Sequence, residues 1–133
     1  MTIGMVAALR NSRLDAISTA AGSAALLTLY SGTRPATGGT ATTALATFTM
    51  GTPFAPASSA GVLSPNLPSA TTGLVGAGAG TAATWARLTT AAAGFVMDMS
   101  VGTSGADINL NTTTISFGVA VAMTSATLTD GNP

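Results

Sequence analysis

Two hydrophobic periodicities divide the chain at about residue 22. Between Thr2 and about Ala21, one stripe recurs at spacings of three and four residues: Ile3, Val6, Arg10, Leu14 and Ile17. This spacing predicts one face of an α-helix that stops at Gly22, because glycine readily adopts the conformation that ends a helix. Two roles stay open for the helix: it covers one end of the domain that follows, or it docks as an arm on another subunit.

After Leu26 the pattern changes to alternating apolar and polar positions with many β-branched residues. This period of two predicts short strands: Leu26–Ser31, Thr42–Met50, Thr81–Thr90, Phe95–Ser100 and Thr114–Thr129, the last with a break near Gly118. The proline-containing segment Val62–Gly80 is expected to add edge-strand pieces. The pattern predicts an all-β fold, an antiparallel β-sandwich or jelly-roll with an N-terminal α-helix. We expect a single domain, residues 1–133, with the helix in 1–22 and the sandwich in 23–133.

Alternation also assigns side chains to the two faces of a strand. Trp85 and Arg87 are expected on the same face of their strand. In the next predicted strand, Phe95–Ser100, Asp98 is on the opposite face from three apolar residues: Phe95, Met97 and Met99. Asp98 is therefore expected to face solvent or to pair with Arg87 across a hairpin. Trp85, the only tryptophan, is interpreted as an anchor in the core or in an interface.

Charged residues make up 6% of the chain, against about 25% in an average protein. There are four Arg, four Asp and no Lys, Glu, His or Cys. About 27 of the apolar residues are Ala, and each alanine buries little surface. A thin core and a nearly uncharged surface indicate that neighbouring subunits cover much of the molecule.

The same inventory argues against catalysis. Ser104 lies in a glycine-flanked loop, but the chain has no His or Lys to activate it as a nucleophile. The side chains that usually perform general acid–base catalysis near neutral pH are also missing. We therefore expect neither an enzyme nor a cofactor.

The run Asp107–Asn111 matches the first positions of a calcium-binding loop. Thr112 stands where that loop needs glycine, and Gly118 stands where it needs a bidentate glutamate. Simple alternation explains the run better, with Ile108 and Leu110 facing inward, so no metal site is expected. The balanced charge predicts no nucleic-acid partner, and the lack of a long apolar run predicts no membrane span.

Three segments together resemble a known family: LYSGTRPATGGTATTALATF (Leu29–Phe48), TAATWARL (Thr81–Leu88) and VMDMSVGTSGADINLNTTTISFG (Val96–Gly118). They are similar to small structural proteins from the head-gene region of tailed bacteriophages, the capsid decoration or cement proteins. The opening IGMVAALRNSRLDAI (Ile3–Ile17) fits the same pattern. The resemblance covers most of the chain, and its most specific part is the run after Gly102.

The resemblance implies a β-sandwich or jelly-roll on the outside of a capsid, where it bridges capsomers, and it carries no catalytic motif. The expected partners are the major capsid protein and further copies of the chain, in a homodimer or homotrimer. The expected location is the exterior of the virion, after synthesis in the cytoplasm of the bacterial host. Candidate contact residues lie in the helix and near the tryptophan: Ile3, Val6, Arg10, Arg13, Arg34 and Trp85. For Arg13, the expected counter-ion is Asp15 or a carboxylate of a partner.

Two alternatives remain open. The first is a tail or neck component, at the head–tail junction or in the minor tail, that forms a ring. The second is a carbohydrate-binding β-sandwich for host attachment. The second would require several exposed aromatic side chains, and only 5% of the residues are aromatic.

Overall fold

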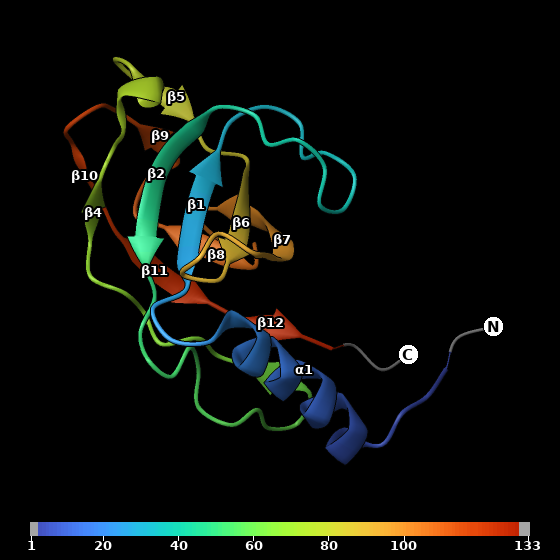
Figure 1. Ribbon diagram of the computed structural model, residues 1–133. Coiled ribbons are helices and arrows are strands. Elements are labelled where there is room, and N and C mark those ends of the chain that lie inside the picture. The colour runs from blue at the N-terminus through green and yellow to red at the C-terminus, as the bar shows by residue number, and fades with distance from the viewer. Residues whose placement is uncertain (1–2, 131–133) are drawn as a thin grey trace.

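A curled six-stranded sheet forms the body of the molecule in the computed structural model, which describes residues 3–130 (Figure 1). Its strands, in spatial order, are β11 (Met123–Ala126), β8 (Ile108–Leu110), β7 (Phe95–Gly102), β6 (Trp85–Thr89), β1 (Leu26–Tyr30) and β2 (Ala44–Thr49). Neighbouring strands are antiparallel except β7 and β8, which run parallel. Helix α1 (Ala7–Ala21) lies beside one end of the sheet.

Three two-stranded ribbons complete the β-structure: β3 (Val62–Leu63) with β12 (Leu128–Thr129), β4 (Thr71–Thr72) with β10 (Ala120–Val121), and β5 (Thr81–Ala82) with β9 (Thr114–Ile115). A 3-10 turn, η1 (Val75–Ala77), follows β4. The predicted β-rich fold with one N-terminal helix is confirmed. The prediction of a purely antiparallel arrangement is wrong, because one pair of strands is parallel.

The parallel pair results from the tight loop that follows β7. Parallel neighbours ordinarily need a crossover of a dozen or more residues. Here β7 and β8 share only two residue pairs, Val101 with Ile108 and Gly102 with Asn109. A loop of a few residues is therefore long enough to connect the two strands. Asp107 closes this loop: its Oδ2 accepts hydrogen bonds from the backbone N–H and the hydroxyl of Ser100, at 3.0 and 2.9 Å. The run that resembled a calcium loop therefore contains a side chain used to shape a turn.

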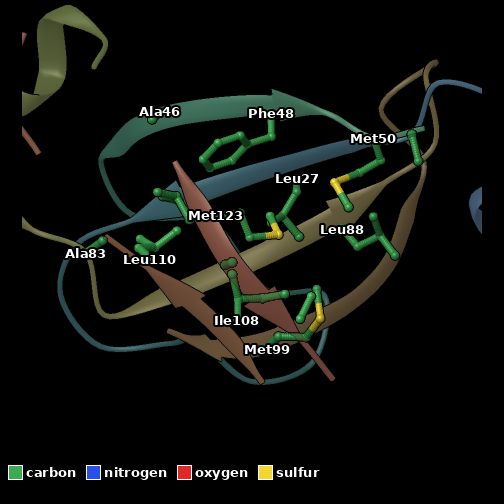
Figure 2. Close-up of a cluster of buried hydrophobic side chains, with 14 of the residues drawn as sticks. Leu27, Ala46, Phe48, Met50, Ala83, Leu88, Met99, Ile108, Leu110 and Met123 are labelled. Carbon is green, nitrogen blue, oxygen red and sulfur yellow. The ribbon is translucent and has the colours of Figure 1, made fainter. Parts of the chain in front are cut away.

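The inner face of the sheet carries the core (Figure 2). Alternate residues of the central strands are buried there, as their period of two predicted. The labelled members include Leu27, Phe48, Leu88, Met99, Ile108 and Leu110. The inward orientation expected for Ile108 and Leu110 is confirmed, since each is 1% exposed.

The helix begins later than predicted. Val6 is its N-cap residue, in an extended conformation, and Ala7 is the first helical residue, whereas the predicted start at Thr2 lies outside the described residues. Gly4, a poor helix former, precedes this start. Leu14 is buried and Ile17 half-buried against the core, so the predicted stripe is correct within the helix itself.

Three strand predictions need correction. The expected strand Thr81–Thr90 is divided into β5 and β6, which belong to different sheets. The expected strand Thr114–Thr129 is divided into β9, β10, β11 and β12, with Gly118 in a left-handed conformation at the first break. Phe95 was expected on the same face as Met97, but a bulge between β6 and β7 pairs it with Thr89 instead. Thr89 lies on the same face of β6 as Arg87, which is two residues away. The bulge therefore turns Phe95 toward the outer face.

Candidate protein–protein interaction surfaces

Polar contacts fix α1 against the loop that precedes β3. The backbone N–H of Gly61 donates to Asn11 Oδ1, and the backbone N–H of Ser58 donates to Asp15 Oδ1, both at 2.8 Å. The Ser58 hydroxyl donates to the carbonyl of Asn11 at 2.9 Å. The bond from the Ser58 N–H is the main cause that lowers the pKa of Asp15, because it favours the ionised carboxylate.

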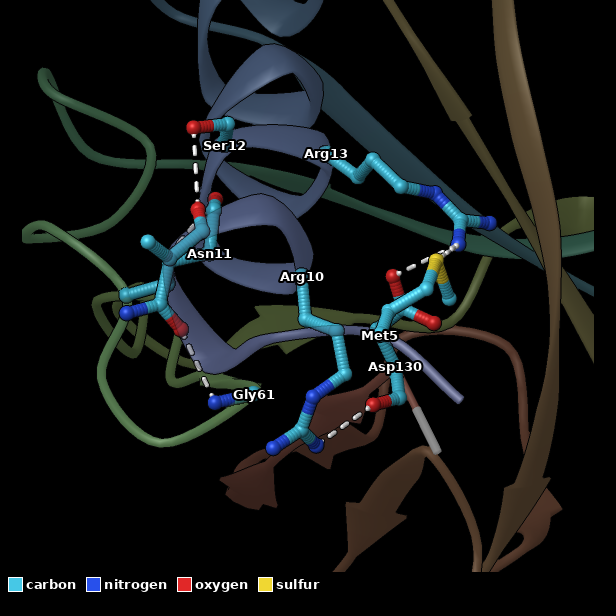
Figure 3. Close-up of polar contacts among 9 residues, drawn as sticks. Met5, Arg10, Asn11, Ser12, Arg13, Gly61 and Asp130 are labelled. Atoms are coloured by element: carbon cyan, nitrogen blue, oxygen red, sulfur yellow. Dashed lines mark hydrogen bonds and ion pairs between the residues drawn. The ribbon is translucent and has the colours of Figure 1, made fainter. Parts of the chain in front are cut away.

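Two predicted contact residues, Arg10 and Arg13, connect α1 to the end of β12 (Figure 3). Arg10 Nη1 donates to the carbonyl of Asp130 at 3.1 Å, and Arg13 Nη1 lies 3.2 Å from Asp130 Oδ2. The ion pair of Arg13 is therefore with Asp130 rather than with Asp15, which Ser58 occupies. Both arginines act within the chain, although the Arg13 side chain remains about half exposed.

The other two predicted contact residues near the N-terminus, Ile3 and Val6, lie ahead of the helix. They are 73% and 70% exposed, and Leu9 in the first helical turn is 49% exposed. We call these three residues the N-terminal patch. Figure 1 shows this segment extending away from the body of the molecule. The chain presents these apolar side chains to solvent or to a neighbour.

A second apolar surface lies at the opposite end of the molecule, near η1 and β10 (Figure 1). Its members, which we call the far-end patch, are Leu74, Val75, Phe117 and Val119. A parallel bridge joins Gly73 to Phe117, and the Gly73 N–H donates to the carbonyl of Val119 at 3.0 Å, so the two segments lie side by side. Val75 is 77% exposed and Phe117 60% exposed.

Reasoning from the sequence missed the far-end patch. Its members come from segments about 40 residues apart, and only the pairing of β4 with β10 brings them together. One signal was available in the sequence. Phe117 and Val119 flank Gly118 at the point where the alternation of the predicted strand breaks.

Trp85, another of the predicted contact residues, lies on the outer face of the sheet and is only 1% exposed. Its ring stacks on Tyr30, with 4.4 Å between centroids. Its indole N–H donates to the Ser31 carbonyl at 3.3 Å and to Thr42 Oγ1 at 3.1 Å. Trp85 therefore anchors both ends of the loop formed by residues 31–43, and it presents almost no surface of its own to a partner.

Arg87 completes this outer-face cluster, and of the two alternatives expected for Asp98 the structure has the pair with Arg87. Arg87 Nε and Nη2 donate to the two carboxylate oxygens of Asp98, at 2.7 and 3.0 Å, and Nη1 donates to the Gly39 carbonyl at 2.9 Å. The guanidinium carbon lies 5.2 Å from the centroid of Trp85 and 5.1 Å from that of Phe95. The hydrogen bond with Asp98 is the main cause that raises the pKa of Arg87. This cluster holds the middle of the 31–43 loop, as Trp85 holds its ends.

The sixth predicted contact residue, Arg34, is exposed at the tip of that loop. The candidate residues therefore do not form one site. Ile3, Val6, Arg10 and Arg13 lie at the helical end, while Arg34 lies on the loop that Trp85 anchors.

No family model matches the chain, and neither a curated protein nor a solved structure matches it. Within residues 3–130, no helix is long and apolar enough to cross a membrane.

Proposed function

We propose that this protein is a structural component of a virion, a capsid decoration protein that binds the outer surface of the major capsid shell. In this proposal its curled sheet and short ribbons form a variant of the sandwich or jelly-roll expected from the sequence. The resemblance of segments such as Val96–Gly118 to decoration proteins supports the proposal. So does the composition, which lacks the side chains that most catalytic sites need.

The observation that carries the proposal is the pair of exposed apolar patches. Soluble monomers rarely expose large contiguous apolar areas, and such areas usually mark contacts with other molecules. Here the patches belong to a chain with only eight charged side chains and a net charge of zero, which gives little protection against association. A protein that works while covered by neighbours has no need of that protection. Repetition over a symmetric shell makes many individually weak contacts durable.

The position of the two patches favours one second candidate, a ring in the tail or neck. Patches at opposite ends of a subunit fit a head-to-tail contact, and such contacts close into rings when the rotation between subunits permits. A carbohydrate-binding role has less support, because Trp85 is buried beneath the 31–43 loop and offers no platform for a sugar.

One experiment separates the two structural roles. The protein is located by electron cryomicroscopy of particles of the phage that encodes it, with and without a deletion of its gene. Density over the whole icosahedral shell is the expected result, whereas density at one vertex or in the tail would assign the protein to the ring. Quantitative gel analysis gives an independent answer, since a shell protein is present in far more copies than a neck ring. Particles that lack the protein altogether would overturn both roles.

A further inference from the structure

Seven of the eight charged side chains already have a polar partner within the chain. Arg87 pairs with Asp98, and Arg13 with Asp130. Arg10 donates to a backbone carbonyl, while Asp15 and Asp107 accept bonds from Ser58 and Ser100. Arg34 is the exception: it makes no hydrogen bond or ion pair with any residue of 3–130.

The loop that presents Arg34 is held in place at several points. Trp85 binds Ser31 and Thr42 at its two ends, and Arg87 binds the Gly39 carbonyl. The ring of Phe95 lies against the loop, 3.9 Å from the position that a Cβ on Gly38 would occupy. A restrained loop lowers the entropic cost of binding a partner. An unpaired charge on such a loop is therefore preorganised to bind an oppositely charged group.

Arg34 borders a hollow of about 420 Å³ between the loop and the start of β7. Residues 34–37 form the loop side of the hollow, and residues 95–98 form the strand side. The hollow thus combines one cation with apolar and aromatic walls. Asp98 does not repel an anion strongly, because Arg87 engages both of its carboxylate oxygens and its side chain is 7% exposed.

We propose that this hollow is the contact site for a carboxylate-bearing segment of another protein, with the carboxylate on Arg34 and a neighbouring apolar side chain against Phe95. Arginine suits this role because its planar guanidinium binds a carboxylate through two parallel hydrogen bonds. A second copy of the chain is a poor source of this carboxylate, since each of its four Asp side chains already accepts a hydrogen bond or forms an ion pair. The inference rests on the proposed function, under which the segment belongs to the major capsid protein.

The test measures binding of the purified protein to capsid shells assembled without it. The variants are Arg34→Gln, which removes the charge, and Arg34→Lys, which keeps the charge without the planar fork. Ser69→Asp is the matched control: it changes the net charge by the same amount as Arg34→Gln, at an exposed serine outside the hollow. Thermal unfolding shows whether each variant is folded, and Arg34 has no hydrogen bond or ion pair within residues 3–130 that the substitution would remove.

We expect Arg34→Gln to weaken binding by about tenfold to a hundredfold, the effect of losing one hydrogen-bonded charge pair. Arg34→Lys should fall between this variant and the wild type, and Ser69→Asp should bind like the wild type. Added salt should reduce the difference between the wild type and Arg34→Gln. Equal binding of Arg34→Gln and the wild type would overturn the inference and leave the proposed function intact, and so would an equal loss in Ser69→Asp. Wild-type protein that does not bind shells would overturn both.

Discussion

Two arginines, Arg87 on the sheet and Arg10 on the helix, show how differently this chain uses its few charges. On the outer face of the sheet, all three kinds of guanidinium nitrogen of Arg87 donate to oxygen, two of them to one carboxylate. At the helix, Arg10 makes one bond to a backbone carbonyl, and its Nε is buried without a partner in the described part of the chain. The first arrangement is a satisfied buried network, while the second leaves a buried polar atom unpaired, which costs free energy.

The comparison predicts that the Arg87 cluster contributes more to stability than the contact of Arg10 with the end of β12. Four substitutions test this difference.

The largest effect is expected from Asp98→Ala. The variant leaves Arg87, whose side chain is 12% exposed, without its counter-ion, and breaking a buried pair in this way typically costs about 3–5 kcal/mol of unfolding free energy. Urea denaturation followed by the fluorescence of Trp85, the only tryptophan, measures the loss inside the cluster itself. The double variant Arg87→Met with Asp98→Leu should recover much of this stability, because neither residue is then an isolated charge. A loss below about 1 kcal/mol in Asp98→Ala would show that the pair is not the anchor that its geometry indicates.

A smaller effect is expected from Gly61→Ala at the docking site of the helix. Gly61 has φ of +77°, which costs an alanine about 1–2 kcal/mol, and its added Cβ would lie 2.3 Å from Arg10 Nη1. The guanidinium must then move from its place beside Asp130. In the background of Arg10→Ala, the same glycine substitution should cost less, namely the backbone strain and the close approach of its Cβ to the Asp130 carbonyl oxygen at 3.2 Å, and a double-mutant cycle in urea resolves the difference. Equal costs in the two backgrounds would show that Arg10 does not press on this turn.

Arg10→Met should have a still smaller effect, within about 1 kcal/mol of the wild type. The change removes one hydrogen bond to the Asp130 carbonyl, but it also removes the buried Nε that lacks a partner. Methionine keeps much of the aliphatic stem of arginine, so the packing changes little. The measurement is the urea midpoint, compared with that of Arg87→Met, which should be far lower. Similar losses in the two variants would remove the distinction between the two arginines.

These contrasts mark the limit of what the sequence can predict. Alternation was sufficient to turn Ile108 inward, because the period of two is a property of a single strand. For Asp98 it left two alternatives, solvent or Arg87, and the register of β6 with β7 decides between them. Alternation failed at Phe95, where one extra residue in a bulge reverses the face. It also did not locate the far-end patch: the break at Gly118 marks only one of its two segments, and the patch depends on pairing between segments distant in sequence.

The candidate contact residues show the same limit. Exposure of Ile3, Val6 and Arg34 agrees with a contact role, but the chain's only tryptophan became a buried anchor for a loop. The sequence identifies Trp85 as an anchor, and only the fold shows that it holds the chain's own loop. The partners of Arg10 and Arg13 depend on where the last strand ends, which the periodicity of the helix does not contain.

The smallest effect concerns pH and tests the helix alone. The pKa of Asp15 is lowered from its ordinary value of 3.8, chiefly by the Ser58 N–H. The unfolded chain therefore takes up this proton at a higher pH than the folded protein does. The stabilisation is complete above the unfolded pKa of about 3.8 and disappears as the pH falls through the lower folded value. The difference in urea midpoint between the wild type and Asp15→Asn should accordingly be larger near pH 6 and shrink at the acid end of a series to about pH 2.5.

Taking the difference from Asp15→Asn cancels the contributions of all other ionisable groups, which both proteins share. Asp15 is only partly buried, so the effect should also weaken in added salt. A difference that stays constant with pH would mean that Asp15 holds Ser58 no better when ionised than an amide does. The charge of Asp15 would then add nothing to the attachment of the helix, which its other contacts, such as those of Asn11 and Leu14, would provide.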